Sequence, residues 1–239
     1  MELNEFCKEI EEKSSKIDIN LDNEICNKLY NYMNLLLEWN EKINLTAITD
    51  EKEIILKHFI DSFTINKFIN SGDKMLDIGT GAGFPGLPIK IIRPEVDVFL
   101  MDSLNKRINF LNEVIESLQL KNIEAFHSRA EEMAKNNKFR EKFDVVTSRA
   151  VAKLNILLEY MLPYTKVNGK CLCMKGPNIE EEIKEAEKAL KILGGEIEKI
   201  EKIILPDSNI ERKIIIIRKK SATPLKYPRK AGMPTKEPL

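Results

Sequence analysis

The feature that most constrains this chain is a regular alternation of β-rich and helical segments that begins near Lys74. Helical patterns such as 103–118 and 179–190 separate seven runs rich in β-branched and aromatic residues. The runs are KMLDIG, VDVFLMD, IEAFHS, FDVVTS, GKCLCMK, GEIEKIEKIIL and RKIIIIRK. Strands that alternate with helices predict an α/β fold with a doubly wound parallel sheet. Because only 206–210 joins the last two strands, we expect a hairpin that ends the sheet with an antiparallel strand.

Residues 1–70 have a different, helical pattern. Leu29, Met33, Leu36 and Leu37 recur at helical spacing, and a second helical stretch, EKEIILKHFIDSFTINKFI, follows Asp50. We therefore expect an N-terminal helical extension over residues 1–70 and an α/β domain with a basic C-terminal end over residues 71–239.

The composition narrows the class of protein. Hydrophobic residues make up 43% and charged residues 32% of the chain, which is typical of a globular protein. No apolar run is long enough to span a membrane, and the acidic start does not resemble a secretory signal, so we expect a cytoplasmic protein. Four cysteines are too few for a disulfide framework at this length, and no Cys/His spacing resembles a metal site.

The zero net charge hides an asymmetry along the chain. Residues 212–239 carry nine bases and one acid, a formal charge of +8, whereas residues 1–211 carry 29 bases and 37 acids, a charge of −8. A basic end on an acidic body indicates a polyanion contact confined to one region. A solvated tail is the alternative interpretation.

A glycine-rich segment follows the first predicted strand. Gly79, Gly81 and Gly83 would permit a tight turn and the close approach of the backbone to a ligand. Asp102 closes the second strand, where an acid can accept hydrogen bonds from both ribose hydroxyls of an adenosine. Ser103 can then cap the next helix.

Two ligands compete for this turn. The pattern G-x-G-x-x-G at residues 81–86 would suit a dinucleotide. The fuller pattern, with Asp77 two residues before Gly79, resembles the first motif of class I S-adenosylmethionine-dependent methyltransferases. Asp77 could hold the ammonium of the methionine moiety, directly or through water, whereas it would repel a pyrophosphate. A dehydrogenase would also need a second substrate domain, so the pattern favours methyl transfer over hydride transfer.

Two later strand ends carry further candidate residues. Ala130 and Glu131 follow the third strand, where the adenine lies in a methyltransferase sheet. Arg149 stands where methyltransferases of exocyclic amines usually have Asp/Asn-Pro-Pro-aromatic, which disfavours adenine-N6 and cytosine-N4 as targets. Its guanidinium could bind a phosphate, a carboxylate or a guanine edge. Cys171 and Cys173 share one strand face, and we interpret them as core residues rather than nucleophiles.

Six segments of the chain form a specific set: WNEKINLTAIT, HFIDS, DIGTGAGFPGLP, DSLNKR, SRAVA and YPRKAGMPTK. Together they resemble one family, the bacterial 16S ribosomal RNA guanine-N7 methyltransferases, formerly called glucose-inhibited division protein B. The similarity runs from about Leu35 to the end, and Gly-Phe-Pro-Gly and Tyr-Pro-Arg-Lys are its most specific parts. Ala231 departs from a proline that is frequent in the family tail.

The resemblance implies a class I methyltransferase fold, S-adenosylmethionine as cofactor, and methylation of a guanine N7 in a 16S ribosomal RNA loop near the decoding centre. N7 carries a free lone pair at neutral pH, so we expect catalysis by positioning, without a general base or metal. N7 lies in the deep groove of A-form RNA, so the target must be in a loop or flipped out.

The motifs and the resemblance together give two sets of expected site residues in a monomeric protein. The expected cofactor-binding residues are Asp77, Gly79, Gly81, Gly83, Phe84, Asp102, Ser103, Ala130, Glu131 and Arg149. The expected RNA-binding residues are Arg149, Lys153, Lys226, Tyr227, Arg229 and Lys230.

Two alternatives stay open from the sequence. One is a non-catalytic RNA-binding protein on a methyltransferase fold, against which the intact glycines, Asp77 and Asp102 argue. The other is a methyltransferase for a substrate other than RNA, which would leave the +8 segment unexplained.

Overall fold

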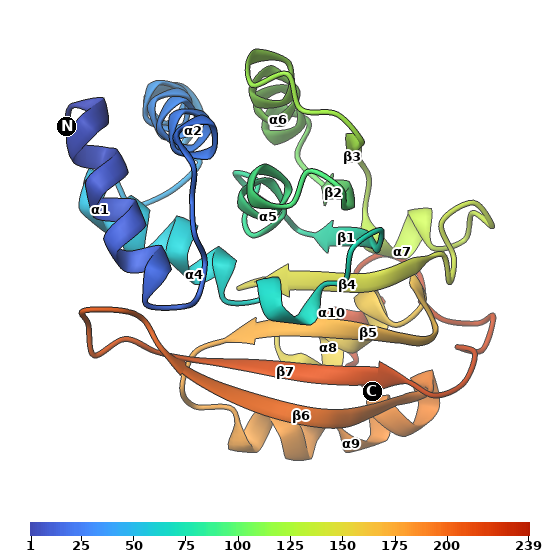
Figure 1. The fold of residues 1–239 in the computed structure, drawn as a ribbon. Helices are drawn as coiled ribbons and strands as arrows, with labels where there is room; N and C mark the ends of the chain where they lie inside the picture. Colours follow the sequence, from blue (N-terminus) through green and yellow to red (C-terminus); the bar gives the residue numbers. More distant parts are fainter.

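A computed structural model describes residues 1–239 (Figure 1). Four α-helices, a π-helical segment and a 3₁₀ turn make up the N-terminal part, and the rest contains seven strands, the first six of which are separated by helices. The first part contains α1 (Leu3–Ser15), α2 (Asn23–Ile43), α3 (Glu51–Ile54), the π-helical η1 (Ile55–Ile60), α4 (Asp61–Phe63) and the 3₁₀ turn η2 (Asn66–Phe68). The second part contains β1 (Lys74–Ile78), α5 (Gly86–Ile92), β2 (Asp97–Asp102), α6 (Asn105–Ser117), β3 (Ile123–His127), α7 (Ala130–Met133), β4 (Phe143–Arg149), α8 (Leu154–Met161), β5 (Thr165–Lys175), α9 (Glu180–Leu193), β6 (Gly195–Ile204), β7 (Glu211–Lys219) and α10 (Met233–Lys236).

The seven strands form one sheet in the order β3-β2-β1-β4-β5-β7-β6. The first five strands of this order are parallel, and β7 runs antiparallel to both β5 and β6. The predicted doubly wound sheet and its terminal hairpin are therefore confirmed. The carboxyl ends of β1, β2, β3 and β4 meet at one edge, which is where ligands bind in sheets of this kind.

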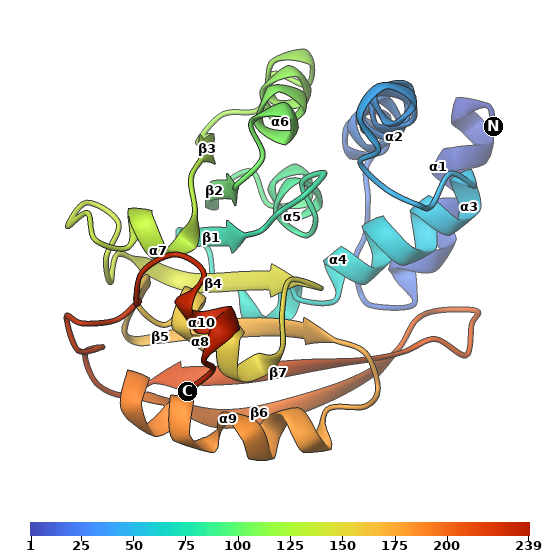
Figure 2. The same cartoon turned by 180° about the vertical axis from the view of Figure 1, so that it is seen from behind.

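Helices cover both faces of the sheet (Figures 1 and 2). The N-terminal helices, α5 and α6 lie on one face, and α8, α9 and α10 lie on the other. Strand residues alternate between the two resulting cores: Ile214 and Ile216 of β7 belong to the first, and Ile215 and Ile217 to the second. A strand that is buried on both faces needs such a continuous apolar run.

The N-terminal extension is helical as predicted and shares a core with the sheet. Phe6, Tyr32 and Phe59 belong to the same cluster of 36 buried residues as Phe84 and Leu100 of the α/β part. The extension therefore completes one layer of the fold, and the division into two domains at residue 70 stays a prediction. No helix of the structure is long and apolar enough to cross a membrane.

Cys171 and Cys173 are fully buried in the second core, as predicted. Burial raises the pKa of the Cys171 thiol to about 11, which keeps this sulfur protonated. A protonated, enclosed thiol is a poor nucleophile, and the two residues contribute packing.

Candidate functional site

The glycine-rich turn after β1 leaves open space beside its backbone. Gly81 has φ +62°, and a Cβ built there would meet no atom within 4 Å. Gly79 has φ +68°, and a Cβ there would lie 2.5 Å from the Val151 side chain. Both positions need glycine, the first because a ligand would otherwise meet a side chain and the second because the loop after β4 lies against the turn.

The buried Asp77 side chain stabilises this turn by hydrogen bonds. Its Oδ2 accepts hydrogen bonds from the Thr80 hydroxyl at 2.6 Å and from Gly86 N at 2.9 Å, while its buried Oδ1 has no partner. Burial raises the pKa of this carboxyl to about 6. An orphaned buried oxygen fits the water-mediated form of the expected role, since a bridging water would satisfy it.

Asp102 occupies the expected place at the end of β2 and is already partly engaged. Its Oδ2 accepts from Gly81 N and from Arg107 Nη1, both at 3.0 Å, and its Oδ1 accepts from Leu104 N at 2.9 Å. A carboxylate offers about four acceptor positions, so a ribose would find one free and would displace Arg107 to gain a second. The expected Ser103 cap is wrong: Leu104 is the N-cap residue of α6, no side chain caps this helix, and the Asp102 carboxylate accepts from the N–H of Leu104.

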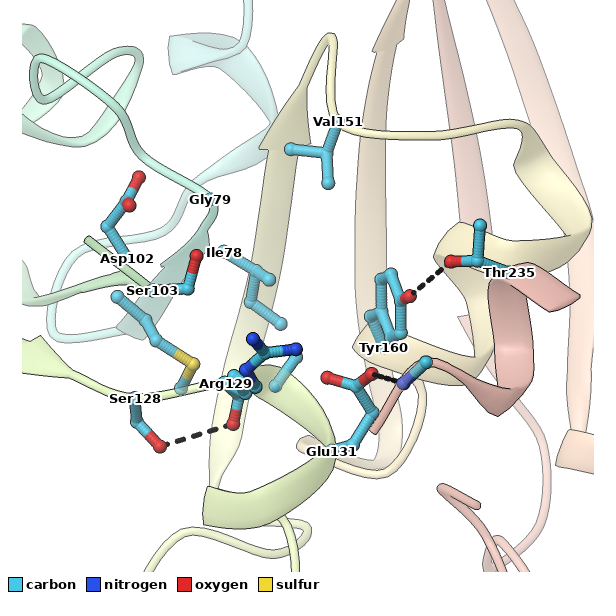
Figure 3. Close-up of a pocket in the computed structure, with 13 residues that line it drawn as sticks. Ile78, Gly79, Asp102, Ser103, Ser128, Arg129, Glu131, Val151, Tyr160 and Thr235 are labelled. Atoms are coloured by element: carbon cyan, nitrogen blue, oxygen red, sulfur yellow. Dashed lines mark hydrogen bonds between the residues drawn. The ribbon is translucent and has the colours of Figure 1, made fainter. Parts of the chain in front are cut away.

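Two adjoining cavities bring most of the expected cofactor residues together. One, of about 220 Å³, is lined by Gly79, Asp102, Ser103, Ala130 and Glu131 among others (Figure 3). The other, of about 440 Å³, is lined by Gly79, Gly81, Phe84, Asp102, Ser103 and Arg149 among others. Because the cavities share Gly79, Asp102 and Ser103, they form one elongated site along the sheet edge. Asp77 and Gly83 line neither cavity; they belong to the interior of the turn, on the side away from the cavities.

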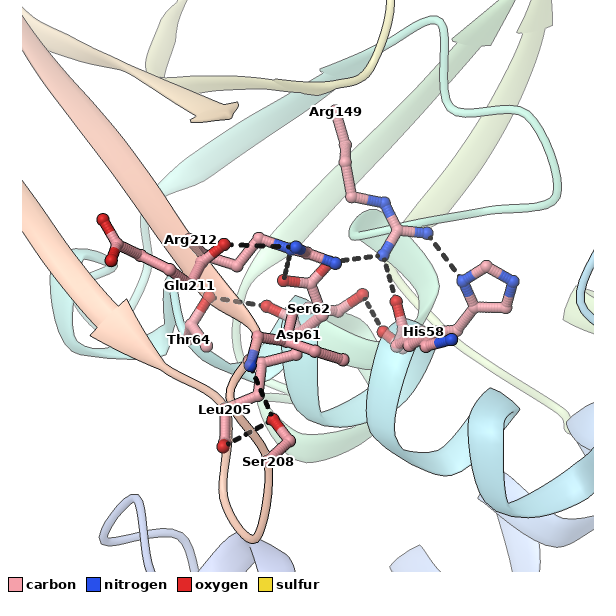
Figure 4. A network of polar contacts seen from close by, with 11 residues as sticks. His58, Asp61, Ser62, Thr64, Arg149, Leu205, Ser208, Glu211 and Arg212 are labelled. Atoms are coloured by element: carbon pink, nitrogen blue, oxygen red, sulfur yellow. Dashed lines mark hydrogen bonds and ion pairs between the residues drawn. The ribbon is translucent and has the colours of Figure 1, made fainter. Parts of the chain in front are cut away.

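Arg149 faces the N-terminal extension at the end of this site (Figure 4). Its Nη1 donates to Lys57 O and to Asp61 Oδ2, both at 3.0 Å, and its Nη2 lies 3.1 Å from His58 Nδ1. The guanidinium also lies 5.0 Å from the centre of the Phe84 ring. Arg149 therefore links the cofactor turn to the helical extension.

Asp61 holds two arginines at once, which the sequence analysis did not foresee. It is 2% exposed, and its second carboxylate oxygen accepts from Arg212 Nε at 3.1 Å. His58 is stacked on Phe84 at 4.5 Å, and burial together with Arg149 lowers the pKa of its imidazole to about 3. The spacing of His58 and Asp61, one helical turn apart, was a signal that both face one site. Arg212 lies far away in sequence and carried no such signal.

A third cavity, of about 360 Å³, opens on the other side of Arg149. It shares His58, Arg149 and Ala150 with the larger cofactor cavity. Its lining contains four cationic side chains and one acidic one, namely Lys57, Arg149, Lys175, Arg212 and Asp61. Lys57 and Lys175 also pair with Glu53 and Glu182, which lie outside the lining. The cavity with these two partners has a net charge of +1 and is therefore electropositive.

The structure places two of the expected RNA-binding residues differently from the prediction. Tyr227 is only 7% exposed and packs in the second core, because the chain after β7 turns back onto the domain. Arg229 forms a forked ion pair with Glu159, which is buried. Lys226 and Lys230 are exposed and make no ion pair, and exposed Lys153 pairs with Glu185.

Comparisons with known proteins match most of the chain to one family. The family model described as rRNA small subunit methyltransferase G matches residues 25–213. Proteins named ribosomal RNA small subunit methyltransferase G are similar over most of the chain. One from Desulforamulus reducens is 57% identical over 210 residues, covering 87% of this chain and 88% of its own. One from Alkaliphilus oremlandii is 47% identical and covers 100% of both chains.

Solved structures share the fold. A SAM-dependent methyltransferase from Aquifex aeolicus superposes with a TM-score of 0.54 at 19% identity, over 73% of this chain and 96% of that chain. TYW2 from M. jannaschii, solved in complex with AdoMet, has a TM-score of 0.55 at 14% identity, over 72% and 79% of the two chains. The chain belongs to the family described as rRNA small subunit methyltransferase G.

Proposed function

We propose that this protein transfers a methyl group from S-adenosylmethionine to N7 of a guanine in 16S ribosomal RNA. The observation that carries the proposal, beside the family, is the continuity of two sites. The elongated cofactor site and the electropositive cavity share His58, Arg149 and Ala150. A methyl donor on one side of Arg149 and an RNA nucleotide on the other would thus have their reactive ends close together.

The residues of the elongated site fit the cofactor. Gly79 and Gly81 offer backbone surface without side chains, Asp102 has an acceptor position left for a ribose hydroxyl, and Glu131 lies at the far end for the adenine. The orphaned Asp77 oxygen suits the ammonium of the methionine moiety, through water. Bound there, S-adenosylmethionine supplies a methyl group on a sulfonium sulfur, which the lone pair of guanine N7 can accept.

The side chains near Arg149 are suited to positioning rather than to proton transfer. Both ring nitrogens of His58 are engaged, Nδ1 by Arg149 and Nε2 by the Thr46 hydroxyl at 2.9 Å, and its low pKa keeps it neutral. Attack by N7 releases no proton, so no base is needed. The cations of the third cavity would neutralise the phosphates of the target nucleotide and hold it against the cofactor.

The partner would be the small ribosomal subunit or its RNA, in the cytoplasm, with the protein acting as a monomer. A guanine in a loop, such as one near the decoding centre, suits this site because N7 is inaccessible in an A-form duplex. Lys153, Lys226 and Lys230 are exposed cations that could contact the surrounding phosphates.

The test is to map N7-methylguanine along 16S ribosomal RNA from the parent strain and from a strain that lacks this gene. We expect one modified guanine to be lost, and restored by the full chain but not by Gly81→Asp. If the methylation pattern is the same in both strains, the proposal is wrong.

A further inference from the structure

One wall of the smaller cofactor cavity comes from the end of the chain. Gly232 and Thr235 line this cavity, and Thr235 lies across it from Gly79 and Asp102 (Figure 3). They belong to the C-terminal tail, residues 220–239, whose positive charge suggests an RNA contact. The tail is therefore connected to the cofactor site as well as to the proposed RNA contact.

The path of the tail is held by buried contacts. Arg229 donates to Glu159 from Nε at 3.0 Å, from Nη2 at 2.6 Å and from its backbone N at 2.7 Å. The Glu159 side chain is 1% exposed. Arg140 donates to the carbonyls of Tyr227 and Thr223, both at 2.8 Å. A buried carboxylate that loses its only cation is costly, so these contacts fix where the next residues lie.

Beyond these anchors the tail contacts the cavity lining itself. Gly232 N donates to Glu131 Oε1 at 3.0 Å, and the Thr235 and Tyr160 hydroxyls lie 3.2 Å apart (Figure 3). Glu131 is the residue at the adenine end of the site. One of its oxygens is oriented by the tail, which leaves the other to accept from an adenine amino group.

We propose that residues 232–235 of the C-terminal tail are part of the cofactor site, as the wall over the adenosine end and the group that orients Glu131. This inference rests on the proposed use of S-adenosylmethionine. Its consequence is that part of the affinity for the adenosine moiety depends on a segment outside the sheet and its helices. The cations Lys226, Lys230 and Lys236 are exposed, so a contact with RNA and the wall are compatible.

The experiment measures the Kd of S-adenosylmethionine by isothermal titration for four forms of the protein. They are the full chain, a chain that ends at Lys230, Thr235→Trp, and Lys236→Trp as the matched control. The shortened chain keeps Tyr227 and Arg229, and Thr235 is exposed at the cavity, so both variants keep the buried anchors. We expect Kd to rise at least tenfold for the shortened chain and for Thr235→Trp, and less than twofold for the control.

The outcomes separate this inference from the proposed function. An unchanged Kd in Thr235→Trp, with a thermal midpoint equal to that of the full chain, overturns the wall whether or not the shortened chain folds. An equal rise in Lys236→Trp also overturns it, since the effect would then not depend on the cavity. A full chain that does not bind S-adenosylmethionine at all refutes the proposed function instead.

Discussion

The two ends of the chain both border the site, but they are attached in different ways. The N-terminal extension contributes Phe6, Tyr32 and Phe59 to a core of 36 residues and reaches the site through Asp61. The C-terminal tail is attached by a few separate contacts: buried Thr223 and Tyr227, the Arg140 hydrogen bonds to their carbonyls, and the ion pair of Arg229 with Glu159. The N-terminal extension is thus part of the folded core, whereas the C-terminal tail is a short segment that packs on the surface of the domain. Substitutions should therefore affect stability at the first and ligand binding at the second.

The largest effect expected is that of Asp61→Ala. It leaves the Arg149 and Arg212 guanidiniums without their shared, buried carboxylate, and such a loss costs about 3–5 kcal/mol. Urea unfolding measures it. The matched control is Asp207→Ala, which removes an exposed carboxylate that also bridges two cations, Lys13 and Lys16, and should change stability little. If both variants change the free energy of unfolding equally little, Asp61 does not stabilise the fold through these two arginines.

Next in size is the loss of cofactor affinity in Gly81→Asp. The new side chain would occupy the open space beside the turn, and its charge would lie near the carboxylate of the methionine moiety. We expect at least a hundredfold rise in Kd, about 2.7 kcal/mol, by calorimetry. Gly72→Asp is the control, because Gly72 also has positive φ, +77°, and open space around its Cβ, but lies before β1. If both variants bind the cofactor like the parent, the turn does not hold it.

A smaller effect is the dependence of stability on pH that His58 contributes. The pKa of its imidazole is about 3 in the folded protein against the ordinary value of 6.5, so the unfolded state binds the proton first as the pH falls. Stability from this group is present above pH 6.5 and is lost progressively toward pH 3, by up to about 1.4 kcal/mol per pH unit. Asp77, with its raised pKa of about 6, opposes this loss between pH 6 and 3.8.

The pH dependence is checked by thermal unfolding of His58→Gln and of His127→Gln, which removes an exposed histidine. We expect a shallower decline below pH 6.5 in the first variant alone. An identical pH profile for His58→Gln and the parent would show that the folded protein accepts the proton at this position.

The smallest effect concerns the tail's free cations. Neutralising Lys226 and Lys230 should change the thermal midpoint and the cofactor Kd little, because both side chains are exposed, neither forms an ion pair, and Lys226 makes only an exposed cation–π contact with the Tyr227 ring, 5.3 Å from its centre. If both contact phosphates, the slope of log affinity for RNA against log salt should flatten by about 1.4, since each contact contributes about 0.7 on single strands. If the salt dependence of RNA affinity is unchanged in the folded double variant, these lysines do not contact the RNA phosphates.

The periodic parts of the fold could be predicted from the sequence because their signals are local. The seven β-rich runs and the glycine-rich turn specify strands, crossovers and a ligand edge without any knowledge of the partners. The predicted placement of Gly79, Asp102 and Glu131 around one cavity follows from topology alone.

The remaining features depend on contacts between distant residues, which charge and periodicity do not encode. Counting the bases of residues 212–239 gave +8 but could not show that Glu159, 70 positions earlier, neutralises Arg229. Likewise, the link between Asp61 and Arg212 joins the extension to the last strand, 151 residues away. Ser103 was a reasonable N-cap by residue type, but α6 begins one residue later, with Leu104 at the N-cap position and no side chain capping the helix.

The reversed direction of β7 affects which charged side chains can line the third cavity. Because β7 is antiparallel to β5, Lys213 near the start of β7 pairs with Lys175 at the end of β5. Arg212, the residue before Lys213, lies one position beyond this pair. The β6–β7 turn, residues 205–210, therefore helps determine which of Glu211, Arg212 and Lys213 meets the third cavity. Side chains alternate along a strand, so a slip of one residue would replace an arginine by its neighbour and turn it to the opposite face. Insertions in this surface turn would thus change the charged side chains that line the third cavity without altering β1, β2 or the glycine-rich turn after β1.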